Sequence, residues 1–397
     1  MCYTLPMTET VPSYFSFLEC PVCQEQFNPE EIQTFCDACQ SPLLSAYDLQ
    51  KMKKDIPKST LSDRRTQGVW RWHELLPVKK TENQFSLGEG DTPFLPLNRI
   101  TASINLNHVF VKDESQNPTG TFKARGLAVA VSKAYELGLH SLVLPTAGNA
   151  GGALAAYAAR AGLEAHIYMP RDAPRVNREE VSITGANLNL VDGLISDAAE
   201  KAAEDASSQD WFSMSTFKEP YRLEGKKTLG FELAEQNDWK LPDVIIYPTG
   251  GGTGLVGMWK AFNELEKLGW IDSRRPRMVS VQAAGCAPIV KAISEDAPDI
   301  QPWENAHTIA DGLCVPNVFA EKLILSTLRE SEGTAISVTD QEIKGAQALL
   351  GEYEGLFTSP EGAATLAAAI KLSKEDWLSP EEQIVLFNTG SGLKYVH

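Results

Sequence analysis

Short apolar runs alternate with helical patterns along most of the chain, from about residue 108 onward. The apolar runs predict strands at 109–111, 141–145, 165–169, 187–191, 243–247, 278–282 and 383–387. The segments between them predict helices at 121–137, 152–161, 175–183, 196–206 and 255–268. Short strands that alternate with helices are typical of an α/β protein with mainly parallel sheets covered by helices on both faces.

Two breaks in this pattern, near 207–226 and near 270, divide the chain and predict two α/β lobes. We expect the arm that precedes the lobes to pack on the larger one. The expected divisions, in chain order, are a cysteine-bearing segment at 1–45, an arm and entry segment at 46–107, a smaller lobe at 108–225 and a larger lobe at 226–397.

The composition narrows the class of function. Of the 397 residues, 43% are hydrophobic and 22% charged, as in soluble globular proteins of two or three domains. The net charge of −16 argues against nucleic acid and anionic membranes as partners, so local groups must bind any anionic substrate. No apolar run approaches the roughly 20 residues of a membrane span. The first residues lack a basic region followed by an apolar core, so we expect no signal peptide and a cytoplasmic location.

The seven cysteines form an odd, unevenly spaced set, which suits a reducing compartment better than a disulfide framework. Four of them form two C-x-x-C pairs separated by twelve residues: Cys20, Cys23, Cys36 and Cys39. Each pair can fold as a tight knuckle, and four thiolates complete a tetrahedral zinc shell, which is closed and therefore structural. The alternatives are free cysteines or a degenerate knuckle that has lost its metal. The spacing favours a zinc-ribbon-like segment with a structural zinc ion.

A turn before the helix at 121–137 carries a lysine with a candidate chemical role. The Asn-Pro-Thr-Gly sequence at 117–120 is a strong turn signal, because proline presets φ and glycine permits a tight reversal. Lys123 then lies in the first turn of the helix, where unpaired N–H groups and the positive dipole end disfavour a cation. A lysine that is partly desolvated beside such groups has a depressed pKa and can act as an imine-forming nucleophile. The alternative is a solvated lysine on a helix surface.

A glycine-rich loop follows the strand predicted at 243–247 and precedes a helix. Its residues are Gly250, Gly251, Gly252, Thr253 and Gly254. Consecutive glycines let backbone N–H groups approach an anion closely, and the following helix adds its positive end. The loop is neither a Walker loop, because no Gly-Lys-Ser/Thr follows, nor a Rossmann fingerprint. It predicts a phosphate-binding site; the alternative is a flexible turn.

Two further loops follow predicted strands. The loop at 146–152 consists of small residues and presents several N–H groups and the amide of Asn149. Such a loop can hold a carboxylate and donate a hydrogen bond to the edge of a flat ring. Thr389 follows the strand at 383–387, at the strand end where α/β folds bind ligands. Each loop, taken alone, also has the composition of an ordinary turn.

These four loops follow apolar strands, and we expect them to converge on one crevice. Together they offer an amine, a phosphate site, a carboxylate site and a neutral hydroxyl. This inventory fits pyridoxal 5'-phosphate, with its aldehyde at Lys123, its phosphate at 250–254 and its ring nitrogen at Thr389. A neutral hydroxyl would leave the ring nitrogen unprotonated, which suits elimination and replacement at the β carbon better than transamination.

The four motifs resemble those of the fold-type II (tryptophan synthase β-like) pyridoxal-phosphate enzymes, and among these the threonine synthases. The segments at 117–123, 146–152, 250–254 and 389–394 carry the resemblance, which covers nearly the whole chain. It implies a two-lobed fold-type II enzyme. Some members of the family also carry an N-terminal cysteine ribbon. Because a homodimer is the common assembly of soluble enzymes, we also expect one here.

The resemblance implies roles for individual residues. Lys123 would form the imine with the cofactor, and Phe122 would flank it beside the ring. Asn149 would bond the ring hydroxyl, the 250–254 loop would bind the phosphate, and Thr389 would bond the ring nitrogen. The residues implied to contact the substrate are Thr146, Ala147 and Ala150 around its carboxylate and Arg222 at its phosphate.

Enzymes of this kind convert O-phospho-L-homoserine and water to L-threonine and phosphate by γ-elimination and β-replacement. The resemblance implies the same lyase reaction here, with Lys123 moving protons at Cα and Cβ. One alternative keeps the fold and changes the reaction to that of a serine/threonine ammonia-lyase or a cysteate-synthase-like β-replacement enzyme. Another is a catalytically inactive, zinc-bearing binding protein.

The segment around Arg222 departs from the family pattern. The Asn and Ser that assist this arginine in the family are replaced by Thr216 and Phe217, and Glu219 adds a negative charge nearby. A like charge beside a phosphate lowers affinity unless Lys218 offsets it. The alternative for Arg222 is a structural arginine paired with Glu224 or Glu219.

Overall fold

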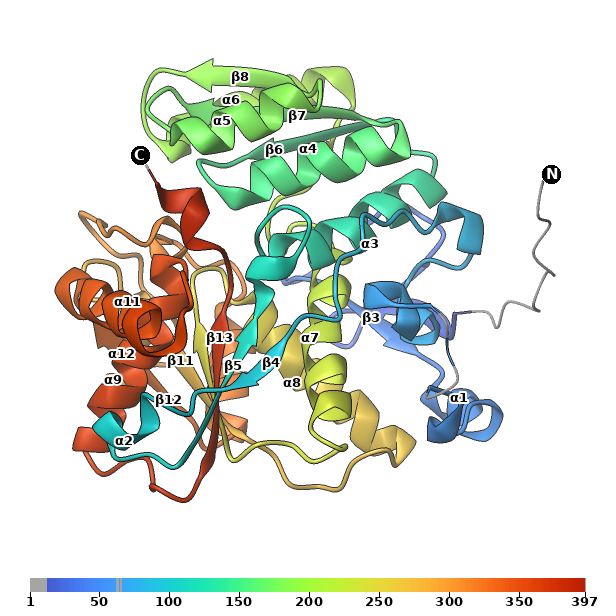
Figure 1. Ribbon diagram of the computed structural model, residues 1–397. Coiled ribbons are helices and arrows are strands. Elements are labelled where there is room, and N and C mark those ends of the chain that lie inside the picture. Colours follow the sequence, from blue (N-terminus) through green and yellow to red (C-terminus); the bar gives the residue numbers. More distant parts are fainter. Residues whose placement is uncertain (1–12, 62–63, 65, 397) are drawn as a thin grey trace, which may run out of the picture.

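The computed structural model describes residues 13–61, 64 and 66–396. The expectation of no signal peptide rests on the first residues, which lie outside these ranges. The described chain forms three sheets (Figure 1), with the strand orders β2-β1-β3, β12-β11-β10-β13-β5-β4 and β8-β7-β6-β9.

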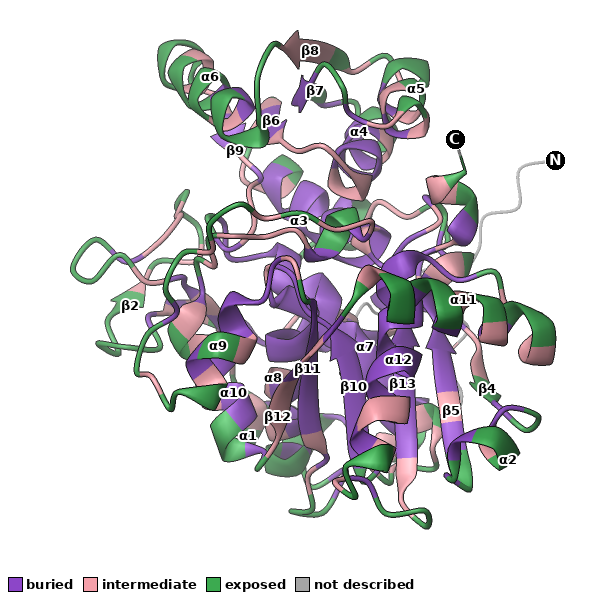
Figure 2. Ribbon diagram, turned by 90° about the vertical axis from the view of Figure 1, so that its left-hand side faces the viewer, coloured by how far each residue is buried: buried purple, intermediate pink, exposed green. Residues whose placement is uncertain are grey.

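The six-stranded sheet is the largest of the three. Its strands are β4 (Phe94–Pro96), β5 (His108–Asp113), β10 (Val244–Pro248), β11 (Arg277–Ala283), β12 (Thr334–Val338) and β13 (Gln383–Asn388). Neighbouring strands are parallel, except that β4 runs antiparallel to β5 at one edge. Figure 2 shows that β10, β11 and β13 are almost wholly buried, whereas the edge strand β4 is mostly exposed.

Two hydrophobic cores cover the two faces of this sheet. Successive side chains of a strand point to opposite faces, so Ile245 and Tyr247 join one core while Val244 and Ile246 join the other. The first core is completed by α7 (Arg222–Gln236), α8 (Thr253–Leu268), α9 (Pro288–Ser294) and α10 (Glu321–Glu330). The second is completed by α2 (Thr101–Ile104), α11 (Asp340–Glu354) and α12 (Pro360–Lys374).

The four-stranded sheet is parallel throughout and lies at the top of Figure 1. Its strands are β6 (Ser141–Pro145), β7 (Glu164–Pro170), β8 (Asn187–Val191) and β9 (Phe212–Ser213). Leu142 and Leu144 of β6 face a core shared with α3 (Lys123–Glu136), α4 (Asn149–Ala161) and α5 (Arg175–Ile183). Val143, between them in sequence, faces α6 (Ile195–Gln209) on the other side.

The N-terminal segment forms the three-stranded sheet and the arm. Its elements are β1 (Phe15–Glu19), β2 (Gln26–Phe27), β3 (Leu44–Tyr47), α1 (Leu49–Asp55) and the 3-10 helices Lys58–Leu61, Gly68–Leu75 and Thr81–Asn83. Trp72 of the arm lies 5.3 Å from the ring of Phe231 on α7, within the core of the larger sheet. Trp70 joins the core of the smaller sheet instead, so the arm contacts both parts.

The α/β class with mainly parallel sheets is confirmed. Each predicted strand and helix has a counterpart whose ends differ by at most three residues. The break expected at 207–226 does not end where predicted, because α7 already begins at Arg222. A surface helix is identified in a sequence by separate apolar and polar faces. In α7 the charged residues are buried together with the apolar ones, so its sequence does not show this separation; these residues are Arg222, Glu224, Lys226, Lys227 and Glu232.

One strand lies in a different sheet from the one that the sequence division assigns to it. β5 falls within the segment 108–225 expected to form the smaller lobe, yet it pairs in parallel with β13 along its whole length, from Gln383↔His108 to Asn388↔Asp113. An apolar run predicts a strand but carries no information on its pairing partner. The larger sheet therefore contains strands that come before the smaller sheet in the chain and strands that come after it.

Candidate active site

A cavity lies where the predicted loops meet. The carboxyl ends of parallel strands lie at one edge of a sheet, and β10 and β13 deliver their following loops to the cavity from that edge. Its lining residues are Thr121, Phe122, Lys123, Asn149, Thr216, Tyr247, Pro248, Gly250, Gly251, Gly252, Thr253, Gly254, Gly312, Leu313, Ser359, Glu361, Thr389, Gly390 and Tyr395. Every residue predicted to bind the cofactor is among them.

Lys123 is the first residue of α3, and the turn before it is held in place from two sides. Gly120 adopts φ +66°, a conformation that favours glycine, and its N–H donates to Asn117 O at 2.7 Å. The N–H of Phe122 donates to Thr389 O at 3.0 Å, which ties the turn to the loop after β13. Burial and the nearby Arg222 lower the pKa of Lys123 to about 8, although Glu361 acts in the opposite direction. The amine is therefore poised to react near neutral pH.

A second lysine approaches the same aromatic ring. Lys226 of α7 is buried, and its amine donates to Phe122 O. Its Nζ lies 3.8 Å from the centroid of the Phe122 ring, and Nζ of Lys123 lies 4.3 Å from it. Burial and the neighbouring Lys123 hold the pKa of Lys226 well below its ordinary range. The sequence motif gave no reason to single out this residue.

The glycine loop is packed too closely for side chains. Gly252 adopts φ +80° as the N-cap of α8, and a Cβ on it would overlap Ile324. A Cβ on Gly250 would overlap the backbone of Gly312, and one on Gly254 would overlap the hydroxyl of Tyr247. The loop therefore presents main-chain N–H groups and the positive end of α8 to the cavity, an arrangement that suits a phosphate.

Asn149 and Thr389 reach the cavity from different sheets. Asn149 begins α4, and its Nδ2 donates to the hydroxyl of Tyr395 at 3.2 Å, whereas its Oδ1 is buried without a hydrogen-bond partner among the described residues. Thr389 directly follows β13 and is buried. Both residues line the cavity.

The residues predicted to contact the substrate lie outside the cavity lining. Thr146 accepts from the N–H of Gly148 at 3.1 Å, and the carbonyl of Ala147 accepts from Asn177 at 3.1 Å. Ala150 packs against the core of the smaller sheet. These three belong to the loop that leads into α4, one residue of which, Asn149, does line the cavity.

Arg222 is buried but is not part of the lining either. Its Nη1 donates to Met214 O at 2.5 Å, and its Nε has no partner among the described residues. The carboxylate of Glu219 accepts from the backbone N–H groups of Tyr221 and Arg222 and so caps α7. Among the described side chains, no ion pair joins Arg222 to Glu219 or Glu224; Glu224 pairs with lysines instead.

Sequence reasoning did not identify three polar residues of the lining, Ser359, Glu361 and Tyr395, of which the last two make hydrogen bonds there. The first of these two is Glu361, in the first turn of α12, whose Oε1 accepts from Gly312 N and from the hydroxyl of Tyr395, both at 2.7 Å. The second is Tyr395 itself, which bridges Glu361 and Asn149. The Ser359-Pro360-Glu361 sequence is an ordinary helix start, so only its position beside the loop after β13 could have identified it.

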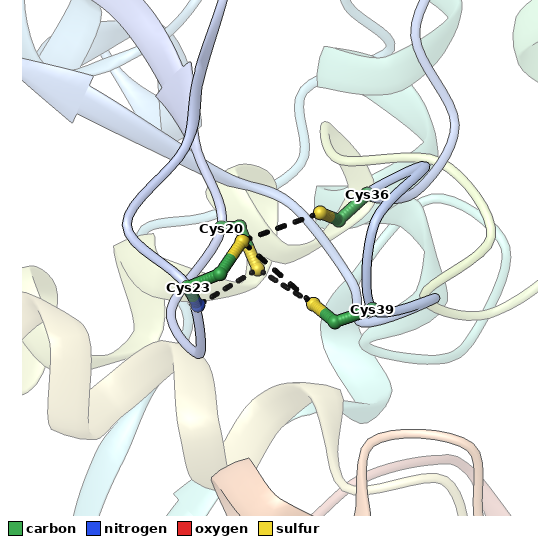
Figure 3. A group of neighbouring side chains, drawn as sticks. All are labelled: Cys20, Cys23, Cys36 and Cys39. Carbon is green, nitrogen blue, oxygen red and sulfur yellow. Dashed lines mark hydrogen bonds between the residues drawn. The ribbon is translucent and has the colours of Figure 1, made fainter.

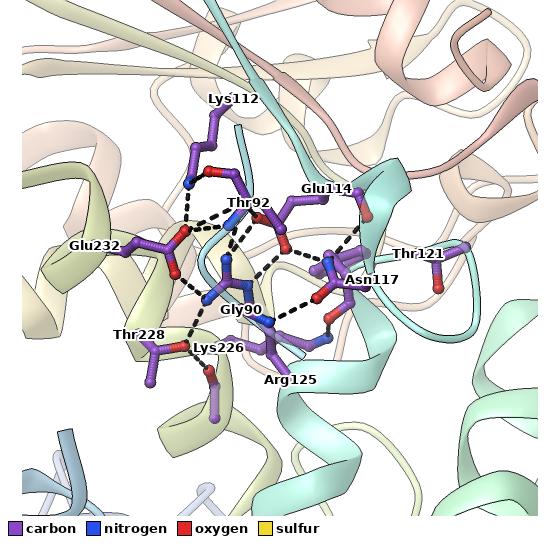
Figure 4. Close-up of polar contacts among 12 residues, drawn as sticks. Gly90, Thr92, Lys112, Glu114, Asn117, Thr121, Arg125, Lys226, Thr228 and Glu232 are labelled. Carbon is purple, nitrogen blue, oxygen red and sulfur yellow. Dashed lines mark hydrogen bonds and ion pairs between the residues drawn. The ribbon is translucent and has the colours of Figure 1, made fainter. Parts of the chain in front are cut away.

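A buried ion-pair network holds α3 in place (Figure 4). Arg125 donates to Glu114 from Nε at 2.6 Å and from Nη2 at 2.8 Å, and to Glu232 from Nη1 at 2.8 Å. Lys112 also pairs with Glu232. Arg125, Glu114 and Lys112 are fully buried and Glu232 nearly so, and the two positive charges balance the two negative ones. The network therefore fixes the helix that carries Lys123 to β5 and α7.

The four predicted metal ligands lie together in the N-terminal segment (Figure 3). The sulfur atoms of Cys20, Cys23, Cys36 and Cys39 all lie within 4.8 Å of one another. Cys20 and Cys39 are 3.2 Å apart and Cys23 and Cys36 are 3.5 Å apart. Four converging thiols are the donor set of a structural zinc site.

Comparison with known proteins agrees with this geometry. The model of the family described as "Pyridoxal-phosphate dependent enzyme" matches residues 85–390. The threonine synthase of Methanocaldococcus jannaschii is 36% identical over 94% of this chain and 92% of its own length. That of Methanosarcina acetivorans is 36% identical over 95% of this chain and 92% of its own length.

Within the described ranges, no helix has the length and apolarity needed to cross a bilayer.

Solved structures share the fold. The structure of maize serine racemase superimposes with a TM-score of 0.65 at 24% identity, covering 76% of this chain and 88% of that one. The structure of the processed form of threonine deaminase isoform 2 from Solanum lycopersicum superimposes with a TM-score of 0.66 at 18% identity, covering 97% of this chain and 95% of that one.

The cavity, with its half-buried lysine, its unpartnered Asn149 oxygen and its glycine-rich loop, fits the cofactor of this family. The chain belongs to the fold-type II pyridoxal-phosphate dependent enzymes, with threonine synthases as its relatives.

Proposed function

We propose that this chain is a threonine synthase, which converts O-phospho-L-homoserine and water to L-threonine and phosphate. The observation that carries the proposal is the convergence of Lys123, the glycine loop, Asn149 and Thr389 on one cavity. Relatives of that name, similar over more than nine-tenths of the chain, support this reaction over others on the same fold.

Each part of the cavity has a role in holding the cofactor. The 250–254 loop would hold its phosphate, Asn149 its ring hydroxyl, Thr389 its ring nitrogen and Lys123 its aldehyde carbon, while Phe122 flanks the amine. When bound, the cofactor supplies an electron sink for a carbanion at the substrate. Lys123 takes and returns protons at Cα and Cβ, for which a pKa of about 8 is suitable because both protonation states are populated near neutral pH.

The substrate's carboxylate would lie against the loop of Thr146, Ala147 and Ala150, near the N-terminal end of α4, where N–H groups are unpaired. Its phosphate would be bound by Arg222, a buried guanidinium whose charge acts on the amine of Lys123. Arg222 would have to turn from Met214 O toward the cavity wall at Thr216 to make this contact.

The position of Arg222 also favours a second candidate function. A guanidinium outside the lining, with the Glu219 carboxylate close by, leaves the cavity without a charged group dedicated to a phosphate. An ammonia-lyase acting on serine or threonine, or a β-replacement enzyme, needs no such group. These activities are the alternative to the proposed one.

The two functions are separated by incubating the purified protein and pyridoxal phosphate with O-phospho-L-homoserine. We expect stoichiometric release of phosphate and formation of threonine. Serine and threonine, offered separately, should yield little ammonia. Ammonia release from these two amino acids without phosphate release from phosphohomoserine would contradict the proposal and support the alternative.

The reactivity of Lys123 should depend on pH in a distinctive way. Burial and Arg222 lower its pKa to about 8, so the neutral amine fraction rises about tenfold per pH unit below that value and is nearly complete above it. We therefore expect the rate at which the apoprotein forms an imine with pyridoxal phosphate to rise with pH and level off just above 8. Stopped-flow absorbance measures this rate. A rate that keeps rising to pH 10, as for an ordinary lysine, would contradict the assignment.

The N-terminal cluster should bind zinc. We expect the protein to contain one zinc ion per chain, held by Cys20, Cys23, Cys36 and Cys39. The Cys36→Ser variant should lose the metal and melt at a lower temperature, because metal binding and folding are coupled at structural sites. The Cys286→Ser variant, outside the cluster, is the control and should keep its zinc. Elemental analysis decides; a zinc-free wild-type protein that melts unchanged after metal addition would argue for free cysteines.

We further propose a homodimer in the cytoplasm, organised as the cysteine segment 1–45, the arm 46–107 and the two lobes 108–225 and 226–397, with the exception that β5 belongs to the larger lobe. The uneven cysteine set supports a reducing compartment. Light scattering of the holoenzyme measures the assembly state.

A further inference from the structure

Two cysteines outside the N-terminal cluster lie together beside the cavity. Cys286 follows β11 and is fully buried, whereas Cys314, in the loop before α10, is half-buried, and both are free thiols. Their side chains form a hydrogen bond with each other, and the backbone N–H of Val315 donates to the sulfur of Cys286. The fold therefore brings two thiols from separate loops into contact.

The residues on both sides of Cys314 support the glycine loop. A Cβ on Gly250 would overlap the carbonyl oxygen of Gly312 and lie 2.9 Å from a side-chain carbon of Val315. Gly312 and Leu313, which directly precede Cys314, also line the cavity. Because the chain is continuous through these residues, a displacement of Cys314 moves the surface on which the 250–254 loop rests.

The two thiols differ in the way that a reactive and a resolving cysteine differ. A hydrogen bond from Cys286 lowers the pKa of Cys314 to about 7, and His307 acts in the same direction. Burial and the carboxylates of Asp311 and Asp340 oppose this shift without reversing it. The same hydrogen bond, together with burial, raises the pKa of Cys286. At pH 7 about half of Cys314 is then thiolate, against a few per cent for an ordinary cysteine, and the thiolate is the form that oxidants attack.

We propose that Cys314 and Cys286 form a redox-modification site, at which hydrogen peroxide converts the two thiols to a reversible disulfide beside the glycine loop. The sulfur of Cys314 attacks the O–O bond of the peroxide, one oxygen leaves as water, and Cys314 becomes a sulfenic acid. The sulfur of Cys286 then attacks that of Cys314, and the sulfenic hydroxyl leaves as a second water with the proton of Cys286. The two thiols together lose two electrons and two protons, and one peroxide becomes two waters. Thiol–disulfide exchange reverses the change.

The disulfide should weaken the hold of the protein on its cofactor. Closing the bond draws Cys314 toward Cys286 and moves Gly312 and Val315 away from their contacts with Gly250. The 250–254 loop would then be less well placed to bind a phosphate. This site requires neither the substrate nor threonine formation, so failure of the proposed function would leave the inference standing.

The test uses the holoenzyme, loaded with pyridoxal phosphate and treated with a limiting amount of hydrogen peroxide at pH 7. After the remaining thiols are alkylated and the protein is digested, mass spectrometry should find the peptides of Cys286 and Cys314 joined, less two hydrogen atoms. A dithiol reductant should separate them. Gel filtration of the oxidised protein should show loss of the cofactor's visible absorbance, and reduction followed by fresh cofactor should restore it. A Cys314 that stays reduced, or that pairs with a cysteine of the N-terminal cluster, would overturn the proposal.

Two matched variants separate the roles of the thiols. In C286S, whose hydroxyl can still donate to Cys314, oxidation should stop at the sulfenic acid, which dimedone traps. In C314S the same treatment should leave Cys286 reduced. Both variants should keep their cofactor after peroxide, because neither can close the disulfide. The mapping of the wild-type protein needs no substitution, so it decides the question even if a variant fails to fold. An absence of dimedone adduct in C286S, or a disulfide-linked wild-type protein that keeps its cofactor, would contradict the inference.

Discussion

Replacing Lys123 by alanine is expected to remove the covalent link to the cofactor and to lower turnover by at least about 10²–10⁴-fold, the usual contribution of a positioned acid–base group. The amine is the group at the start of α3 that faces the glycine loop across the cavity, and its lowered pKa leaves it partly neutral near pH 8. Alanine cannot form an imine or carry a proton. Steady-state rates and the visible absorbance of the loaded protein measure the two losses.

The neighbouring Lys226 is the necessary control, because its amine approaches the same Phe122 ring. Borohydride reduction of the wild-type holoenzyme, followed by digestion and mass spectrometry, should place the cofactor on the peptide that contains Lys123. The K226M variant should still be labelled at Lys123, whereas K123A should not be labelled at all. Labelling on Lys226 in the wild-type protein would mean that α7, and not α3, carries the imine-forming lysine, and would contradict the proposed site.

The convergence of the predicted loops on one cavity could be predicted because their signals are local. Each of Lys123, the 250–254 loop and Thr389 directly follows an apolar strand or a turn signal, and strand ends converge in α/β folds. Glu361 and Lys226 carry no such signal. Their functional positions arise from the packing of α12 against the loop after β13 and of α7 against α3, contacts that a single sequence does not encode in readable form.

The same reasoning explains where the fold prediction was incomplete. Periodicity identified the helices that have one buried face. It did not identify α7, which is buried nearly all round and includes charged residues among its buried side chains. Lys112, Arg125 and Glu232 look like surface residues in the sequence, yet they form a buried ion-pair network in contact with α3. Hydrophobic patterning cannot detect a core that is built from ion pairs.

This network should make Arg125 the costliest of its charged residues to replace by an apolar one. Burial alone would raise the pKa of Glu232, but Arg125 and Lys112 overcome it and hold the pKa below its ordinary value; the same balance, with Arg125 dominant, holds for Glu114. R125M leaves two buried carboxylates facing each other with Lys112 alone to offset them. Removing one partner of a buried pair costs about 3–5 kcal/mol. Urea unfolding at pH 7.5 should register that loss in the free energy of unfolding.

The pH dependence gives the sharper form of this prediction. A carboxyl group whose folded-state pKa is depressed contributes stability above its unfolded pKa of about 4.3, and that stability is lost as the pH falls through the folded pKa. In R125M the carboxyl pKa values rise, so the buried groups can take up protons already in mildly acidic solution. The variant should therefore be less destabilised relative to wild type at pH 5.5 than at pH 7.5. The control is R171M, which breaks an exposed pair with Asp192 and should match the wild type at both pH values. If R125M were destabilised equally at the two pH values, or no more than R171M, the charges of Glu114 and Glu232 would not be balanced by Arg125 as the structure indicates.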